Sequence, residues 1–322
     1  MKRVRMGVLS KMKDSPLWPW FKLFAELHKI SGDIDPVYPV LRKVHELRNN
    51  SQEQSIWHAL LYVTWYNLGS AEKVLQRWPL PSPVVMEEAG LIGHISWGGL
   101  KTGVERRGFR GKDNEKPFQM INGLLASVWK NYRTLEEWLT ETTKPGGRLG
   151  WQRLYIDFQG YPGNGTWAAY KWCDLTKNVL GYKITSPDIG LGGGGRNAGP
   201  VPGLSLMSGE PWERCARDEE FQEQFYREAR EDGLPWDGLE EMETCLCDFN
   251  STYKGTYYLG HDIDKQMEDI RDCPKEYWEA RRLSFHPEYL GEIQGWDGVR
   301  KDRKPKFKRW LEAQKTITGS DI

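Results

Sequence analysis

The chain has 322 residues and a mass of 37.4 kDa, which is enough for one or two domains with a sizeable core. Its 45 basic and 45 acidic side chains give a formal net charge of zero, so any nucleic-acid face must be a local patch rather than a general positive coat. The mean hydropathy is −0.68, no apolar stretch approaches the ~18–20 residues of a membrane span, and 16 tryptophans exclude a disordered chain. The apolar run at 7–10 is too short for a signal peptide, so we expect a soluble, intracellular protein.

The cysteines favour reduced thiols over a disulfide framework or a metal centre. There are five of them, and an odd number without a secretion signal argues against paired disulfides. Cys245 and Cys247 are separated by one residue, and no second close Cys or His pair completes a tetrahedral zinc site. We predict no metal, and no cofactor motif is present.

Apolar periodicity and capping signals predict helices along the first part of the chain. A capping box at 51–54 opens a buried central helix over 56–68, which Gly69 is expected to end. Ser70 is expected to cap the next helix, which ends near residue 78.

Three further helices follow from the same signals. Apolar residues recur at helical spacing from Phe118 to Tyr132, a capping box begins at Thr134, and a period near 3.6 continues over 239–249. Because convincing alternating strands are absent, we predict an all-α fold.

Charge is unevenly distributed along the chain, although its total is zero. Segment 101–116 carries six basic and three acidic residues, 217–243 has a net charge of −8, and 300–309 has a net charge of +6. The basic tail is either a solvated terminus or a phosphate-attracting segment. The glycine-rich stretch over 190–203 must be a shaped loop rather than regular structure.

The most specific segment is a Pro-Gly-Asn-Gly turn at 162–165. Helices are expected before it, over 151–159, and after it, over 166–180, with a stop at Gly181. Such a turn presents backbone N–H groups at a helix N-terminus, which favours an anion such as a DNA phosphate. The predicted DNA-binding residues are those of the turn and the first helical residue: Pro162, Gly163, Asn164, Gly165 and Thr166.

This stretch resembles the helix-hairpin-helix DNA glycosylases. In that family an apolar helix and a Leu-Gly stop follow the hairpin, and an essential Asp comes about 20 residues further on; here Leu180-Gly181 and Asp188 match those positions. Trp167 occupies the place of the Schiff-base Lys of the lyase-type members, so the resemblance does not imply imine chemistry. Asp188 could also simply cap a turn, and Trp167 could be a core residue.

The C-terminal half is similar to a narrower family, the phage amino acid:DNA transferases, grouped with α-glutamyl/putrescinyl thymine pyrophosphorylases. The similarity rests on Gly195-Arg196-Asn197 in the glycine-rich loop, on Glu-Thr-Cys-Leu-Cys-Asp-Phe at 243–249, and on Tyr258 to His261 with Asp264. Ala198 replaces the family's Gly after the Asn.

The two resemblances together suggest a domain plan. They imply an N-terminal extension over 1–34, a single helical, glycosylase-like catalytic unit over 35–290, and a basic tail over 291–322. Within the catalytic unit lie the hairpin at 151–181, the glycine-rich active-site loop at 189–203 and the signature helix at 237–249.

The narrower resemblance implies a reaction on modified DNA. Its members are thought to act on 5-hydroxymethyluracil that a phage DNA kinase has pyrophosphorylated, and to replace pyrophosphate by an amino acid's amine. A C5 methylene is hidden in the base stack, so the nucleotide must be flipped out. The partners implied are duplex DNA with modified thymines, a free amino acid such as glycine, and the upstream kinase; the protein would be a monomer in the host cytoplasm.

The resemblance also implies roles for individual residues. Asp188 or Glu243 would be the general base, and Arg196 beside Gly194 and Gly195 would hold the pyrophosphate. Asn197 would bind the uracil edge, and Arg196 or Lys171 would bind the amino acid's carboxylate; the remaining substrate-binding candidates are Trp167 and His261.

Alternatives remain at the level of residues and of function. Glu243 could pair with a helix-end cation, Cys245 and Cys247 could be small buried residues, and His261 could end a loop. The chain could instead be a monofunctional glycosylase using Asp188, or a DNA-binding protein without catalysis.

Overall fold

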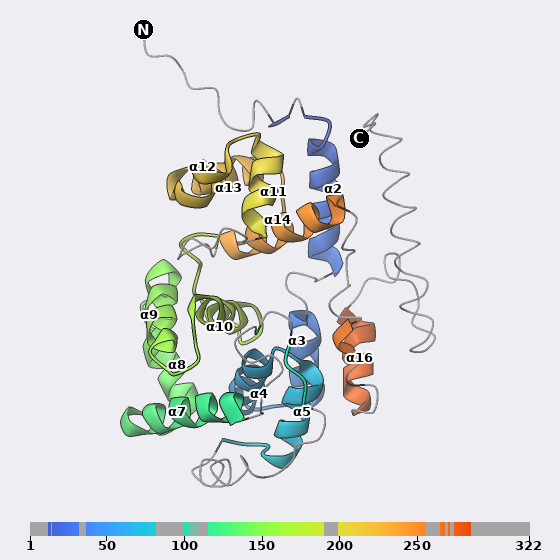
Figure 1. Cartoon of the computed structure of the whole chain (residues 1–322). Coiled ribbons are helices and arrows are strands. Elements are labelled where there is room, and N and C mark those ends of the chain that lie inside the picture. Colours follow the sequence, from blue (N-terminus) through green and yellow to red (C-terminus); the bar gives the residue numbers. More distant parts are fainter. Residues whose placement is uncertain are drawn as a thin grey trace. The chain divides into compact units, whose positions relative to one another are not determined.

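The computed structural model describes residues 12–13, 15–31, 37–81, 100–103, 106, 115–189, 199–254, 265–267, 270 and 274–284. Helices joined by turns and short irregular segments make up these residues, and within them a single isolated bridge, between Gly147 and Ile184, is the one β-type pairing. The predicted all-α class is therefore confirmed (Figure 1).

The chain divides into two compact units. Unit 1 is Met1–Pro36, Pro187–Asp264 and Ser284–Ile322, and unit 2 is Val37–Ser186 and Lys265–Leu283. The predicted catalytic unit over 35–290 stays a prediction. In the described parts of both units, no helix has the length and apolar character that crossing a bilayer requires.

Unit 2 holds most of the helices predicted for the first half. They are α3 (Tyr38–Leu47), α4 (Gln52–Trp65), α5 (Leu68–Arg77), α7 (Glu115–Asn131), α8 (Leu135–Thr143), α9 (Gly147–Gln159), α10 (Thr166–Asn178) and α16 (Lys275–Ser284). Helix α4 is buried on every side from Ser55 to Trp65, and α5, α7, α8 and α10 pack around it. The prediction of a buried central helix is confirmed.

The capping signals explain where these helices begin. Ser51 and Gln54 form the reciprocal capping box of α4, as predicted. The Thr134 hydroxyl accepts a hydrogen bond from the backbone N–H of Glu137, which confirms the predicted start of α8. The Glu53 carboxylate adds a second cap, because its oxygens accept from the first two N–H groups of α8, at 3.0 and 2.7 Å.

Two boundary predictions were wrong. Helix α4 ends at Trp65 rather than at Gly69, because Tyr66 adopts a left-handed conformation with φ 49°. The cap of α5 is Asn67, whose side chain accepts from the N–H of Ser70, so Ser70 lies inside the helix that it was expected to open. Gly69 is a buried residue of the first turn of α5.

Aromatic rings tie the helices around the hairpin together. The indole of Trp172 on α10 stacks on that of Trp138 on α8, with centroids 6.0 Å apart and planes 9° apart. The ring of Phe158 on α9 stacks against Trp172 at 5.4 Å. Helices α8, α9 and α10 therefore share one aromatic core.

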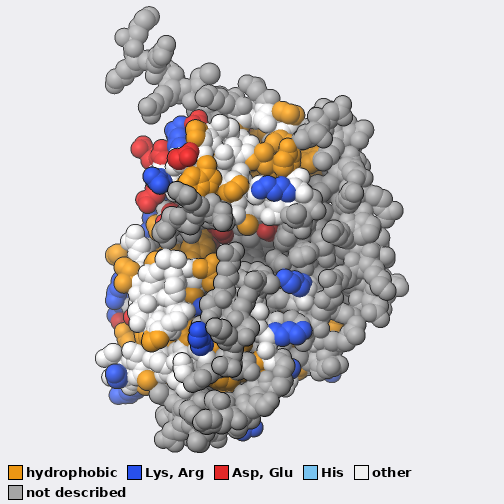
Figure 2. All heavy atoms as spheres, in the orientation of Figure 1, with side chains coloured by type: hydrophobic (Ala, Val, Ile, Leu, Met, Phe, Trp, Pro, Cys, Tyr) orange, Lys and Arg blue, Asp and Glu red, His pale blue; other side chains and the backbone are white. Residues whose placement is uncertain are grey.

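Unit 1 is built from α2 (Trp18–Ser31), α11 (Pro200–Ser208), α12 (Trp212–Arg217), α13 (Glu219–Glu231) and α14 (Leu239–Tyr253). Phe21 and Phe24 of α2 meet Phe249 of α14 edge-on, at 5.0 and 5.4 Å, within one continuous apolar core. Acidic side chains gather at the surface over α12 and α13, where the sequence has its strongest negative segment (Figure 2). Helix α14 confirms the helix predicted over 239–249.

Candidate functional site

The hairpin of unit 2 has the helix–turn–helix form that its sequence predicts. Helices α9 and α10 pack against each other and flank the turn. Gly163 has φ +84°, a conformation that favours glycine, and the N–H of Asn164 closes the turn on the carbonyl of Tyr161 at 3.2 Å. Gly165 is the N-cap of α10 and has no side chain to satisfy the helix's first N–H groups.

The hairpin residues divide into an exposed and a buried set. Pro162, Gly163, Gly165 and Thr166 are exposed, and a Cβ built on Gly165 would meet nothing within 4 Å. Asn164 is different, since only 6% of it is exposed and its side chain points inward, to Arg106. The surface of the turn is therefore made chiefly of backbone.

Two of the predicted substrate-binding residues have partners within unit 2. The half-buried ring of Trp167 meets Tyr66 edge-on at 4.8 Å, and the guanidinium of Arg106 lies 5.7 Å from the Trp167 ring. The ammonium of Lys171 lies 3.7 Å from the carboxylate of Asp174.

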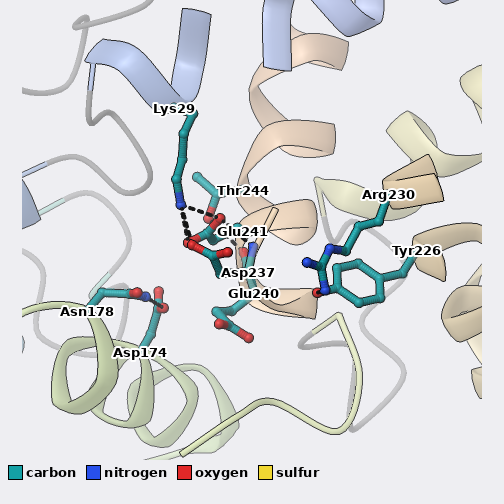
Figure 3. Close-up of polar contacts among 9 residues, drawn as sticks. All are labelled: Lys29, Asp174, Asn178, Tyr226, Arg230, Asp237, Glu240, Glu241 and Thr244. Carbon is teal, nitrogen blue, oxygen red and sulfur yellow. Dashed lines mark hydrogen bonds and ion pairs between the residues drawn. The ribbon is translucent and has the colours of Figure 1, made fainter. Parts of the chain in front are cut away.

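Asp174 organises a small polar network on α10. It is buried, accepts a hydrogen bond from the Tyr38 hydroxyl at 3.1 Å, and accepts another from the Asn178 amide at 2.6 Å (Figure 3). The same carboxylate faces Lys171, so the Lys171 ammonium lies in a negative environment.

In unit 1, Lys29 and His28 of α2 contact carboxylates on the signature helix α14 and just before it. The ammonium of Lys29 contacts the carboxylates of Asp237 and Glu241, each at 2.9 Å (Figure 3). Burial opposes the charge of Lys29, but these hydrogen bonds and ion pairs raise its pKa overall. Seven residues after Glu241, Asp248 lies 3.2 Å from Nε2 of the buried His28. Glu241 and Asp248 lie two turns apart, on the face of α14 that packs on α2.

The predicted general base Glu243 lies on the same helix in a different setting. It is half-buried, and its carboxylate accepts a hydrogen bond from the Thr244 hydroxyl at 3.2 Å. Cys247, one turn further along, is also half-buried, whereas Cys245 is fully buried. Burial raises the pKa of the Cys245 thiol well above its usual value, and the nearby Asp248 charge adds to this, so Cys245 is a protonated core residue.

The end of the glycine-rich segment rests directly on this helix. A Cβ added at Gly199 would overlap the Cys247 sulfur, and one added at Gly203 would overlap the Leu246 carbonyl. These two glycines, one turn apart, therefore allow α11 to cross α14 with nearly direct backbone contact. The prediction of a loop over 190–203 is wrong for Pro200–Gly203, which form the first turn of α11, because Pro200 suits a helix start and Gly203 permits the close crossing on α14.

Asp188 lies at the other end of the same segment. It is half-buried in unit 1, and the next residue, Ile189, is fully buried in the apolar core with Val201. Both ends of the segment are thus anchored within unit 1. The intervening Gly194, Gly195, Arg196 and Asn197 lie outside the described residues, as do His261 and Asp264.

Three side chains at the predicted sites had not been expected. They are Arg106, which contacts the hairpin turn, and Lys29 and His28 of α2, which contact carboxylates of the signature helix. Each meets its partner across at least 57 positions of sequence, so no local spacing could have indicated the contact. One available signal was composition, since Arg106 belongs to the basic segment 101–116.

The described residues form helical units that carry the glycine turn between α9 and α10 and the cysteine-bearing helix α14. The chain belongs to the amino acid:DNA transferase family, whose model matches residues 29–258. It is a transferase that acts on DNA. A curated relative, the putrescinyltransferase of Delftia phage PhiW-14, is 24% identical over 271 residues, which cover 80% of this chain and 79% of that protein.

Proposed function

We propose that this enzyme attaches an amine donor to the C5 methylene of an activated 5-hydroxymethyluracil in phage DNA, in the infected host cell. The observation that carries the proposal is the family match, which spans both the hairpin and the signature helix. DNA is the acceptor, and the donor is an amino acid, with glycine as the first candidate. The name of the phage relative supports a second candidate, the diamine putrescine.

The reaction is a substitution at the C5 methylene. The donor's amine loses a proton to a general base and its nitrogen forms a bond to carbon, while the carbon–oxygen bond breaks and pyrophosphate leaves with the electron pair. A pyrophosphorylated substrate, made beforehand by a DNA kinase, supplies this leaving group. Because the methylene lies within the base stack, the nucleotide is flipped out before reaction.

Our assignment of roles follows the sequence motifs. Asp188 or Glu243 takes the proton from the amine, and both are half-buried carboxylates of unit 1. Arg196 with Gly194 and Gly195 binds the leaving pyrophosphate, and Asn197 reads the uracil edge.

The remaining roles concern the donor and the pocket around the flipped base. Lys171 meets the donor's carboxylate when the donor is an amino acid, while Trp167 and His261 complete the pocket. Since Lys171 already faces Asp174, its role requires that the donor's carboxylate compete with that buried partner.

The hairpin would hold the duplex through its backbone. The first N–H groups of α10 have no side-chain cap, and the surface around them is open enough for a phosphate. Such contacts fix the position of the DNA without reading its sequence.

The decisive experiment is mass spectrometry of nucleosides from pyrophosphomethyluracil DNA incubated with the protein, a pool of amino acids and putrescine. An adduct with an intact glycosidic bond supports the proposal and identifies the donor. Free base or abasic sites, or unchanged DNA, would contradict it. Asp188→Asn and Glu243→Gln, assayed separately, identify the base, because the variant of the true base loses turnover while it still binds DNA.

The hairpin contact has its own matched pair of variants. Thr166→Pro removes one N–H at the first helical position, where proline fits, and Gly165 has the extended ψ of −175° that a following proline requires. Thr166→Ala keeps that N–H and removes only the hydroxyl. We expect Thr166→Pro, and not Thr166→Ala, to weaken binding to duplex DNA; equal affinity for both would contradict the hairpin contact.

A further inference from the structure

Unit 2 contains a small open pocket whose lining residues have no role in the reaction proposed above. It lies where the C-terminal end of α3 meets the start of α4 and the end of α10. Its volume is about 270 Å³, room for roughly nine water molecules at about 30 Å³ each. A pocket of this size suits a small ligand.

The floor of the pocket is polar although it is buried. His45 is 8% exposed and Ser55 is 7% exposed, and both line the pocket beside the buried Val179. Exposed residues, among them Arg42 and Glu46, form the rim. A ligand that displaces water from this floor must offer hydrogen bonds to it, because a buried polar group without a partner costs free energy.

A chain of hydrogen bonds fixes which nitrogen of His45 carries the proton. The Tyr277 hydroxyl donates to the Glu72 carboxylate at 2.7 Å, so it must accept from the Nε2–H of His58, 2.9 Å away. Nδ1 of His58 is then the acceptor for the Nε2–H of His45, at 3.1 Å. The proton of His45 is thereby held on Nε2, and its Nδ1 keeps a lone pair.

Both imidazoles are neutral at neutral pH, as this pattern requires. Burial, helped by the positive charge of Arg48, lowers the pKa of His58 to about 3. Burial, together with His58 and Arg48, also lowers the pKa of His45 well below its usual value. Arg48 donates two hydrogen bonds of 3.0 Å to the Glu72 carboxylate, which anchors the inner end of the chain.

The pocket wall offers three acceptors to a ligand. Within the described part of the chain, nothing donates to Nδ1 of His45 and the Ser55 hydroxyl has no hydrogen-bond partner. The Gln52 Nε2 donates to the carbonyl of Leu180 at 3.2 Å, which leaves the Gln52 Oε1 as an acceptor. Gln52 and Ser55 are three positions apart, so they lie on one face of α4. A primary ammonium group has three N–H donors, which matches these acceptors.

We propose that this pocket binds the primary ammonium group of a small amine, held by His45, Gln52 and Ser55. Arg42 and Glu46 at the rim have opposite charges, which suits an amino acid, with a carboxylate beside its ammonium. The choice of glycine and putrescine as ligands rests on the proposed function, in which such amines are donors. The affinity for an ammonium group rests on the pocket alone.

Isothermal titration calorimetry of the whole chain, without DNA, tests the site. The probes are glycine, putrescine and trimethylglycine, which keeps the charges of glycine but has no N–H group. We expect a primary amine to bind and trimethylglycine not to bind; the amine that binds more tightly identifies the source. If neither primary amine binds, or if trimethylglycine binds equally well, the inference is overturned.

Two variants and a matched control locate the binding. Ser55→Ala removes one acceptor and should weaken binding roughly tenfold, because a hydrogen bond to a charged group contributes about that factor. Gln52→Ala removes a second acceptor at a half-buried position and should have a similar effect. Ser127→Ala removes a half-buried serine hydroxyl of α7, away from the pocket lining, and should leave the affinity unchanged.

The outcomes separate this inference from the proposed function. If Ser55→Ala and Gln52→Ala bind the amine as the wild type does, the inference fails, and an adduct on DNA would still support the proposed function. If both variants lose affinity while the wild type forms no adduct, the site stands and the proposed function fails. Should Ser55→Ala not fold, Gln52→Ala decides between the same outcomes.

Discussion

A methyl group added at Gly199 should destabilise unit 1 through one identifiable overlap. In Gly199→Ala the new carbon would occupy the space of the Cys247 sulfur, while the Cβ and Cα of Cys247 lie 3.3 and 3.8 Å away. The sulfur must rotate out or α11 must move off α14, and overpacking of this kind costs about 1–3 kcal/mol. We expect the free energy of unfolding to fall by about 2 kcal/mol.

Cys247→Ala should relieve most of that cost. Without the sulfur, the nearest remaining contact is the 3.3 Å approach to Cβ, which is tight but tolerable. The double variant should therefore be about 1–2 kcal/mol more stable than the sum of the single effects predicts. Gly203→Ala is the matched control, because its Cβ would overlap the backbone carbonyl of Leu246, which no truncation at position 247 can move.

Urea unfolding followed by far-UV circular dichroism measures all of these variants. Additive effects of Gly199→Ala and Cys247→Ala, or a Gly199→Ala protein as stable as the wild type, would refute the close crossing of α11 on α14. Equal rescue of Gly203→Ala by Cys247→Ala would refute the assignment of the overlap to the sulfur.

Three other variants test separate parts of unit 2. Burial, helped by the Arg48 charge, lowers the pKa of His58 to about 3, so only the unfolded chain takes up its proton below about pH 6.5. The protonation of His58 on unfolding should lower the free energy of unfolding by about 2.5 kcal/mol between pH 7 and 4.5. In urea unfolding measured across this pH range, His58→Gln should remove this part of the pH dependence, which corresponds to the uptake of about one proton. Glu53→Ala leaves the first N–H groups of α8 uncapped and should cost about 1–2 kcal/mol in the same assay; no loss would show that the cap is not needed. At Gly165 a methyl group would meet open space and the φ of −81° is allowed, so Gly165→Ala should lower the free energy of unfolding by no more than about 1 kcal/mol, the N-cap preference for Gly over Ala, while duplex affinity falls. Unchanged affinity in filter binding would argue against close approach of a phosphate.

The elements that the sequence predicted well are those with local causes. The capping box at 51–54 and the cap at Thr134 depend on residues three positions apart, and both are present. The turn at 162–165 is likewise set by its own glycines. The end of α4 was missed because a local preference was overridden: Gly69 looked like a stop signal, but Asn67 is a better helix cap, so the chain turns earlier.

The candidate site was predictable in its motifs and not in its contacts. The resemblance placed Glu243 and the glycine-rich segment in one family pattern, and the structure anchors that segment on Cys247, one turn from Glu243. The pairing of Lys29 with Glu241 spans 212 positions, and that of Arg106 with Asn164 spans 58. Which charges meet over such distances is decided by helix packing, which a single sequence does not encode in any local spacing.

The stacked indoles of Trp138 and Trp172 provide an optical signal for the packing of α8 against α10. Two nearly parallel indoles 6.0 Å apart couple their electronic transitions, and we expect the pair to give a strong near-ultraviolet dichroic band. Both rings belong to unit 2, on helices that pack beside α9. Loss of this band during a urea titration would report the separation of α8 from α10. The aromatic signals of unit 1, such as those of Trp20 and Trp236, would provide an independent readout of that unit.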